Sequence, residues 1–104
     1  MSGVVIHGET VYLSGLTAPN ATPDVADQTR QTLALIDERL AEAGTDKHHL
    51  LSVNIWLSDI RNFDAMNEVW DQWVSDEPPV RATVEARLAV PELLVEIMVV
   101  AALP

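Results

Sequence analysis

The run from Val80 to Leu88 alternates strictly between apolar and polar side chains. This period of two predicts a β-strand with one apolar face and one polar face, and the polar face carries Arg81 and Thr83. Charged strand faces are usually solvent faces, so the pattern by itself favours a solvated Arg81. The alternative is that Arg81 binds a ligand carboxylate, because a guanidinium can donate two parallel hydrogen bonds to it.

A second charge lies in a strongly apolar run. Glu96 falls within the strand that we predict from Leu93 to Ala102, and its neighbours on both sides are apolar. A fixed charge in such a run destabilises the fold unless it forms an ion pair, and it is otherwise kept for a functional role. Glu96 could form a structural ion pair with Arg81 or Arg87, or it could orient or activate a water molecule as a general acid or base. The pattern leaves both interpretations open.

The rest of the chain predicts two helices and three further strands. The first helix is expected to begin at Thr22 as N-cap, with Pro23 in its first position, and to end at Gly44. The second follows Asn62 and ends near Val74. The predicted strands are 4–7, 11–13, 50–57, 80–88 and 93–102. The order β-β-α-β-α-β-β over residues 1–104 predicts one two-layer α+β domain, with both helices on one face of a mixed or antiparallel sheet.

Composition limits the partners of this chain. Hydrophobic residues make up 48% of the 104 residues, which is a large share for so small a domain. Because the helices cover one sheet face, we expect a copy of the same chain to cover the other. A net charge of −10 would repel nucleic acid and anionic membranes, so we expect neither as a partner.

Sequence features also bear on location and cofactors. The N-terminus lacks a basic segment followed by a long apolar one, and the longest apolar run, Ile97–Leu103, is too short to span a bilayer, so we expect a cytoplasmic protein. The absence of cysteine excludes disulfides and thiolate chemistry. His7, His48 and His49 lack metal-ligand spacing, so we expect no metal and no other cofactor.

Two further polar residues, Asn67 and Ser14, can be explained by ordinary structural roles. Asn67 lies near the inward stripe of the second helix, beside Trp70, where an amide usually caps a loop carbonyl. Ser14, directly before Gly15, is typical of a turn at the end of a strand. Trp70 and Trp73 are predicted to belong to the core.

Several blocks of the chain together resemble the RidA (YjgF/YER057c/UK114) family, and the match looks closest to its short YoaB-type branch. The C-terminal block is the most specific, since the helical blocks alone would be a weak match. The blocks are Tyr12–Gly15, Gln28–Gln31, Leu40–Gly44, Asp59–Asn67 and Pro79–Ile97.

The resemblance implies a chorismate-mutase-like α+β fold, a homotrimer, and sites between subunits. It implies hydrolytic deamination of reactive 2-enamino or 2-imino acids to 2-oxo acids and ammonia, without a cofactor. In such deaminases the residue matching Arg81 holds the substrate carboxylate, and the residue matching Glu96 helps to place the attacking water. Positions matching Ser14, Asn67 and Thr83 line the pocket.

The chain departs from the family pattern in three places. Family members usually carry an N-terminal segment with an aromatic residue that closes over the substrate, and this chain begins after it. Leu16 stands where glutamine is common, and Thr83 replaces the cysteine of many deaminases. An alternative function is therefore a non-catalytic module that binds small carboxylates such as 2-oxo acids. The ribonuclease and translation-inhibitor functions attached to some family members are disfavoured by the net charge.

Overall fold

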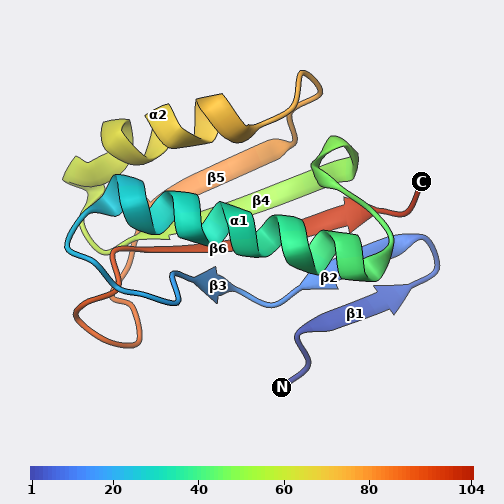
Figure 1. Ribbon diagram of the computed structural model, residues 1–104, viewed down its shortest axis with the longest axis horizontal. Coiled ribbons are helices and arrows are strands. Elements are labelled where there is room, and N and C mark those ends of the chain that lie inside the picture. Colours follow the sequence, from blue (N-terminus) through green and yellow to red (C-terminus); the bar gives the residue numbers. More distant parts are fainter.

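The computed structural model describes all 104 residues and shows two helices packed on one face of a six-stranded sheet (Figure 1). Neither helix is long and apolar enough to cross a membrane. Two short 3₁₀ turns, at Lys47–His49 and Ile60–Asn62, precede β4 and α2. The main elements are β1 (Val4–His7), β2 (Thr10–Leu13), β3 (Leu16–Thr17), α1 (Val25–Ala43), β4 (Leu50–Leu57), α2 (Phe63–Trp73), β5 (Val80–Glu85) and β6 (Val95–Ala102).

The sheet is mixed, in the order β1-β2-β6-β4-β5, with β3 paired to the same edge of β6 as β2. Only β4 and β5 are parallel. The predicted α+β architecture is confirmed, with one strand added: β3 has two residues, too few for a sequence pattern, and no strand was predicted there. The predicted strand 80–88 is too long, because β5 ends at Glu85 and the chain then enters a loop.

Burial alternates along β4 and β6 because the helices cover only one face of the sheet. Val53, Ile55 and Leu57 of β4 point toward the helices, whereas Asn54 and Trp56 point to the other, open face. Strict alternation would place Leu51 on the same face as Val53, but an irregularity between Leu50 and Ser52 shifts the alternation and leaves Leu51 48% exposed.

The orientation of β5 is the reverse of what its sequence favoured. Arg81 lies beside Val53 of β4 and Thr83 beside Ile55, so both point toward the helix layer. Val80 is 72% exposed on the open face instead. The expectation of a solvated Arg81 face was therefore wrong. Alternation separates two faces, but the register with β4 decides which of them meets the helices.

Helix α1 begins later than predicted. Asp24, not Thr22, is the N-cap, and its carboxylate accepts a hydrogen bond from the Ala26 N–H at 2.9 Å. The Thr22 hydroxyl instead donates to Asp27 Oδ2 at 2.5 Å, which folds the preceding loop against the first turn. The predicted end is confirmed: Gly44 has φ 88° and closes the helix in the left-handed conformation that glycine tolerates.

Gln28 of α1 forms hydrogen bonds that connect the helix to the loop between β5 and β6. Its side chain is fully buried and forms three hydrogen bonds to backbone groups. Nε2 donates to the carbonyls of Thr22 and Glu92 at 2.7 and 2.9 Å, and Oε1 accepts from the Leu94 N–H at 2.9 Å. Because every polar atom of the buried amide is paired, Gln28 holds the start of β6 against α1.

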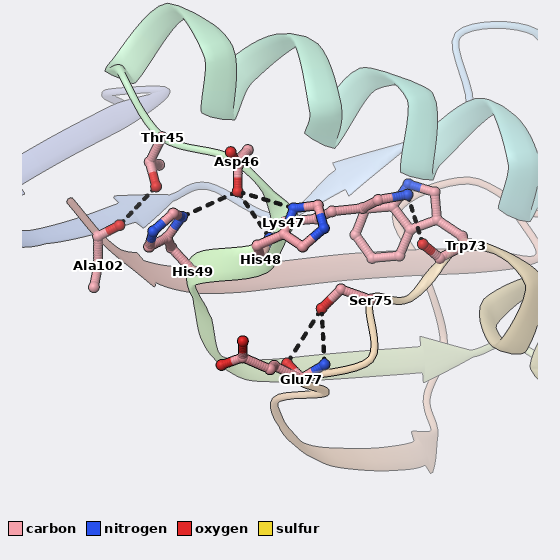
Figure 2. Close-up of polar contacts among 9 residues, drawn as sticks. All are labelled: Thr45, Asp46, Lys47, His48, His49, Trp73, Ser75, Glu77 and Ala102. Carbon is pink, nitrogen blue, oxygen red and sulfur yellow. Dashed lines mark hydrogen bonds and ion pairs between the residues drawn. The ribbon is translucent and has the colours of Figure 1, made fainter. Parts of the chain in front are cut away.

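The C-terminal end of α2 contacts the connection between α1 and β4 through Lys47 (Figure 2). Lys47 Nζ donates to the Trp73 carbonyl at 2.7 Å and lies 5.1 Å from the centroid of the Trp73 ring. The Trp73 indole N–H donates to Asp37 of α1 at 3.0 Å. A cation near the helix C-terminus satisfies a free carbonyl and complements the helix dipole. These contacts set the position of α2 above β5.

Substitution of Asp27 by Asn should destabilise the fold in a pH-dependent way. Hydrogen bonds from the Thr22 hydroxyl and then from the Gln31 amide hold the pKa of Asp27 below its ordinary value of 3.8. A carboxyl whose pKa is lower in the folded state stabilises the fold above the unfolded pKa, and this stabilisation is lost as the pH falls through the folded pKa. We expect Asp27→Asn to lower Tm at pH 7, modestly because the carboxylate is only half-buried.

The same thermal melts should be repeated down to strongly acidic pH, where the difference in Tm should shrink toward zero. Glu38→Gln is the matched control, since Glu38 lies exposed on the same helix and takes part in none of the ion pairs. A Tm deficit of Asp27→Asn that persists unchanged at acidic pH would contradict the role of the carboxylate charge.

Candidate functional site

The first group of predicted residues lies between β5 and α2, and we call it the arginine half-site: Arg81, Thr83 and Asn67, with the rings of Phe63 and Trp70. The guanidinium carbon of Arg81 lies 5.1 Å from the centroid of the Trp70 ring and 5.7 Å from that of Phe63. None of the four ion pairs of the subunit includes Arg81. The half-site thus holds a cation against two aromatic rings without a carboxylate partner.

Partial burial is the main electrostatic influence on Arg81. Desolvation lowers the pKa of its guanidinium, and the nearby Asp71 carboxylate acts in the opposite direction. An arginine stays charged over any ordinary pH range in spite of such a shift. The half-site therefore offers a permanent, partly desolvated positive charge.

Two neutral polar groups accompany this charge. Thr83 follows Arg81 by two residues on the same strand face, and its hydroxyl is the one buried side-chain polar atom of the subunit without a hydrogen-bond partner. Asn67 is half-buried and lies one helical turn from both Phe63 and Trp70, so it belongs to the same side of α2. Its amide donates to Asp71 at 3.4 Å. An unpaired buried hydroxyl is uncommon in a folded protein and marks a place where a ligand atom could bind.

The second group lies on the open face, and we call it the glutamate half-site: Glu96 with Ser14, Gly15 and Trp56. Glu96 pairs across the sheet with Trp56 of β4 and with Thr17 of β3. Its carboxylate lies directly over Gly15, where a Cβ atom would overlap Glu96 Oε2. Ser14 is the residue before this close approach. Gly15 thus provides the space in which the Glu96 carboxylate rests.

A hollow of about 240 Å³ adjoins Glu96. The remaining wall is formed by Trp56 and by the start of the loop that follows β5, at residues 86–89. A larger hollow of about 640 Å³ lies beside the same loop, bordered by Glu85, Arg87 and Pro91 among others, and contains none of the predicted site residues. We therefore base the site on the chemistry around Arg81 and Glu96 and not on the size of the hollows.

The structure does not bring the predicted residues into one place within a subunit. Arg81 and Thr83 point to the helix layer, whereas Glu96 lies opposite Trp56 on the open face. A structural ion pair between Arg81 and Glu96 is thus excluded within the subunit, and Glu96 forms none with Arg87 either. The predicted site is divided into two half-sites on opposite faces of the sheet.

The histidines do not form a metal centre. No three histidine, aspartate or glutamate side chains lie close enough to hold a metal ion. His48 and His49 share the Asp46 carboxylate at 3.4 and 3.0 Å, next to the 3₁₀ turn that Asp46 caps (Figure 2). His7 is exposed on β1.

Two features of the half-sites were missed by the sequence interpretation. Trp70 was assigned to the core, which is correct, but its contact with Arg81 was not anticipated. The spacing of Phe63, Asn67 and Trp70 on one side of a helix was the available signal. The approach of Glu96 to Gly15 joins residues far apart in the chain, and no local pattern indicates it.

Comparisons with known proteins agree with this architecture. A family model described as Endoribonuclease L-PSP matches residues 1–103. The chain is 45% identical over 102 residues to the RutC family protein YoaB of Escherichia coli strain K12, and the match covers 97% of this chain and 89% of that protein. It is 40% identical over 104 residues to a RutC family protein of Haemophilus influenzae, with the same two coverages.

Solved structures extend the likeness to the fold. A YjgF family member from Neisseria meningitidis is 44% identical and superimposes with a TM-score of 0.97, covering 100% of this chain and 87% of that one. A YjgF/YER057c/UK114 family member from Mycobacterium tuberculosis is 33% identical, with a TM-score of 0.92 and coverages of 99% and 87%. Because both sequence and fold match over nearly the whole chain, the protein belongs to the RidA (YjgF/YER057c/UK114) family, in its YoaB-like branch.

Proposed function

We propose that the protein hydrolyses reactive 2-enamino or 2-imino acids to 2-oxo acids and ammonia without a cofactor. The observation that carries the proposal is the arginine half-site, where the unpaired guanidinium of Arg81 lies two residues from the unpaired hydroxyl of Thr83. A planar carboxylate can accept two parallel hydrogen bonds from a guanidinium. A 2-imino acid presents such a carboxylate next to its reactive C=N bond.

The chemistry needs few groups from the protein. The enamine first tautomerises to the imine, whose carboxylate binds Arg81. A water molecule held near Glu96 adds to the C=N carbon, and its proton passes by way of the carboxylate to the nitrogen. The tetrahedral aminoalcohol then collapses, so that the C–N bond breaks, ammonia leaves and the 2-oxo acid remains bound. Much of the acceleration comes from holding the carbon and the water in place.

The two half-sites can contact the same substrate molecule if two copies of the chain associate. Arg81 lies on β5, an edge strand, so the arginine half-site is at the margin of the sheet, where a neighbouring copy can approach. The open face is rich in apolar side chains and suits contact with another copy: Val5 51%, Tyr12 43%, Val80 72% and Val84 50% exposed. We propose a homotrimer, as the family resemblance implies, in which the glutamate half-site of one copy faces the arginine half-site of the next.

Two other functions would use the same surfaces differently. A binding module would hold a 2-oxo acid at Arg81 without turnover, and a coupled assay of imine hydrolysis separates it from an enzyme. A ribonuclease would have to bind a polyanion, which a net charge of −10 opposes. RNA cleavage that persists after nuclease-removal steps would overturn the deaminase proposal.

Light scattering should give the wild-type protein a mass three times that of one 11.4 kDa chain. Val84→Glu places a charge on the open face and should shift the protein toward monomers, because the charge would be desolvated at the interface. Ile60→Glu is the matched control, since Ile60 is similarly exposed, at 43%, but lies in a 3₁₀ turn outside the sheet. A wild-type monomer at micromolar concentration would remove the proposed shared site.

Single substitutions in each half-site should slow hydrolysis, and co-expression of the two variants should restore it in part. Arg81→Lys loses the two-pronged hydrogen bond and should weaken 2-oxobutanoate binding about ten- to a hundredfold. Glu96→Gln should keep binding but slow turnover. In mixed trimers, purified through a different tag on each variant, one interface pairs the intact Arg81 of one copy with the intact Glu96 of another. Such trimers should recover about one third of wild-type activity.

The two variants mixed as separate, already assembled trimers are the control and should show no recovery. Co-expressed mixed trimers that are as inactive as the single variants would mean that the two residues act from the same copy or not at all. Unchanged turnover in Glu96→Gln would return Glu96 to a structural role.

Gly15→Ala should impair turnover without unfolding the protein. The added methyl group would overlap Glu96 Oε2, the far end of a flexible side chain, so the carboxylate turns away and the backbone stays in place. We expect a kcat reduced toward that of Glu96→Gln, with Tm and 2-oxobutanoate affinity near wild type. Gly3→Ala is the matched control, because its added methyl group would meet nothing within 4 Å. Wild-type kcat in Gly15→Ala would contradict this placement of Glu96.

A further inference from the structure

We propose that Phe63 and Trp70 are positioning residues for Arg81: their ring faces hold the guanidinium at the edge of β5, so that its N–H donors stay free for a substrate carboxylate. This inference rests on the carboxylate-binding role proposed above for Arg81. Judged by burial alone, Phe63 and Trp70 would be core residues of α2. The inference gives them an additional role in substrate binding.

The first support is the geometry of the contact. The guanidinium carbon lies 5.1 Å from the Trp70 centroid and 5.7 Å from the Phe63 centroid, both within the range over which a ring attracts a cation. Phe63 and Trp70 are separated by almost two full turns of α2, so both rings lie on one side of the helix. Two rings that lie about two turns apart on the same face of α2 therefore contact Arg81.

The second support is the lack of a competing acid. A half-buried arginine is usually paired with a carboxylate, and that partner would occupy the donors. Here no ion pair includes Arg81, although the chain carries 16 acidic residues. Asp71 is the acid whose charge acts on Arg81, and it lies on α2 with the rings without forming an ion pair with Arg81. A ring face attracts the cation without accepting its in-plane hydrogen bonds, so all five N–H donors remain available.

The third support is the rigidity of the rings. Trp70 is 5% exposed, belongs to the hydrophobic core, and contacts the Trp73 ring with centroids 5.5 Å apart. Lys47 ties the C-terminal end of the same helix to the connection before β4 (Figure 2). A ring held as Trp70 is fixes the position of the cation before substrate arrives, which lowers the entropy lost on binding.

The inference predicts that removing either ring weakens carboxylate binding through Arg81. In calorimetry with 2-oxobutanoate, we expect Trp70→Leu and Phe63→Leu each to bind about threefold to thirtyfold more weakly than wild type. Trp70→Phe keeps a ring face and should retain most of the affinity. Val69→Ala is the control: it removes buried apolar volume from the same helix but no ring, and its affinity should be near wild type.

A double-mutant cycle separates positioning from general loss of packing. If the rings act through the Arg81 cation, then Trp70→Leu or Phe63→Leu should have little further effect on affinity in the Arg81→Gln background, which has no cation for the rings to hold. In steady-state assays, both ring variants should raise KM for the imino acid more than they lower kcat. If Trp70→Leu fails to fold, Phe63→Leu still decides the test, because Phe63 is only half-buried and its loss disturbs the core less.

The outcomes distinguish the two proposals. A wild-type protein that neither binds 2-oxobutanoate nor hydrolyses imines would overturn both. If wild type binds, and Arg81→Lys loses affinity while Phe63→Leu and every folded Trp70 variant bind as wild type does, only the positioning role is overturned. The positioning role is also overturned if the ring substitutions weaken binding equally in the wild-type protein and in the Arg81→Gln variant.

Discussion

The covering of one sheet face by α1 and α2 is the constraint on which the rest of the structure depends. Because successive strand residues point to opposite faces, each side chain of the sheet belongs either to the helix layer or to the open face. Val53 and Ile97 are buried under the helices, while Trp56 and Glu96 lie on the other side. The same rule places Arg81 beneath α2 through its pairing with Val53. The separation of the two half-sites therefore follows from the pleat and the strand register.

Each half-site also depends on an unusual local feature. Around Arg81, aromatic rings take the place that a carboxylate usually holds beside a half-buried cation, which leaves the charge unneutralised within the subunit. Around Glu96, the missing side chain of Gly15 leaves room for a carboxylate on an otherwise apolar strand. Partial burial of the Arg81 guanidinium without an acidic partner costs stability in the single chain. Such costs are typical of sites formed for a ligand or for a second copy of the chain.

Much of the fold could be predicted from local patterns. The two helices, the strands 4–7 and 11–13 and β4 were predicted from local sequence patterns, and Gly44 marked the end of α1 correctly. The errors lay where one local signal competed with another. Thr22 has the side chain of a good N-cap, but it binds Asp27 while Asp24 caps the helix. The two-residue strand β3 is too short to carry a periodic signal.

For the candidate site, the sequence alone determined which residues carry unusual chemistry and which family they resemble. Glu96 stood out because a fixed charge is rare in so apolar a run, whereas Arg81 was singled out by the family resemblance. Only the tertiary structure decided that the two charges lie on opposite faces of the sheet, and that Trp70 and Gly15 accompany them. The alternation of a strand is symmetric between its two faces. Which face meets the helices is set by the register with the neighbouring strand, a contact between residues distant in the chain.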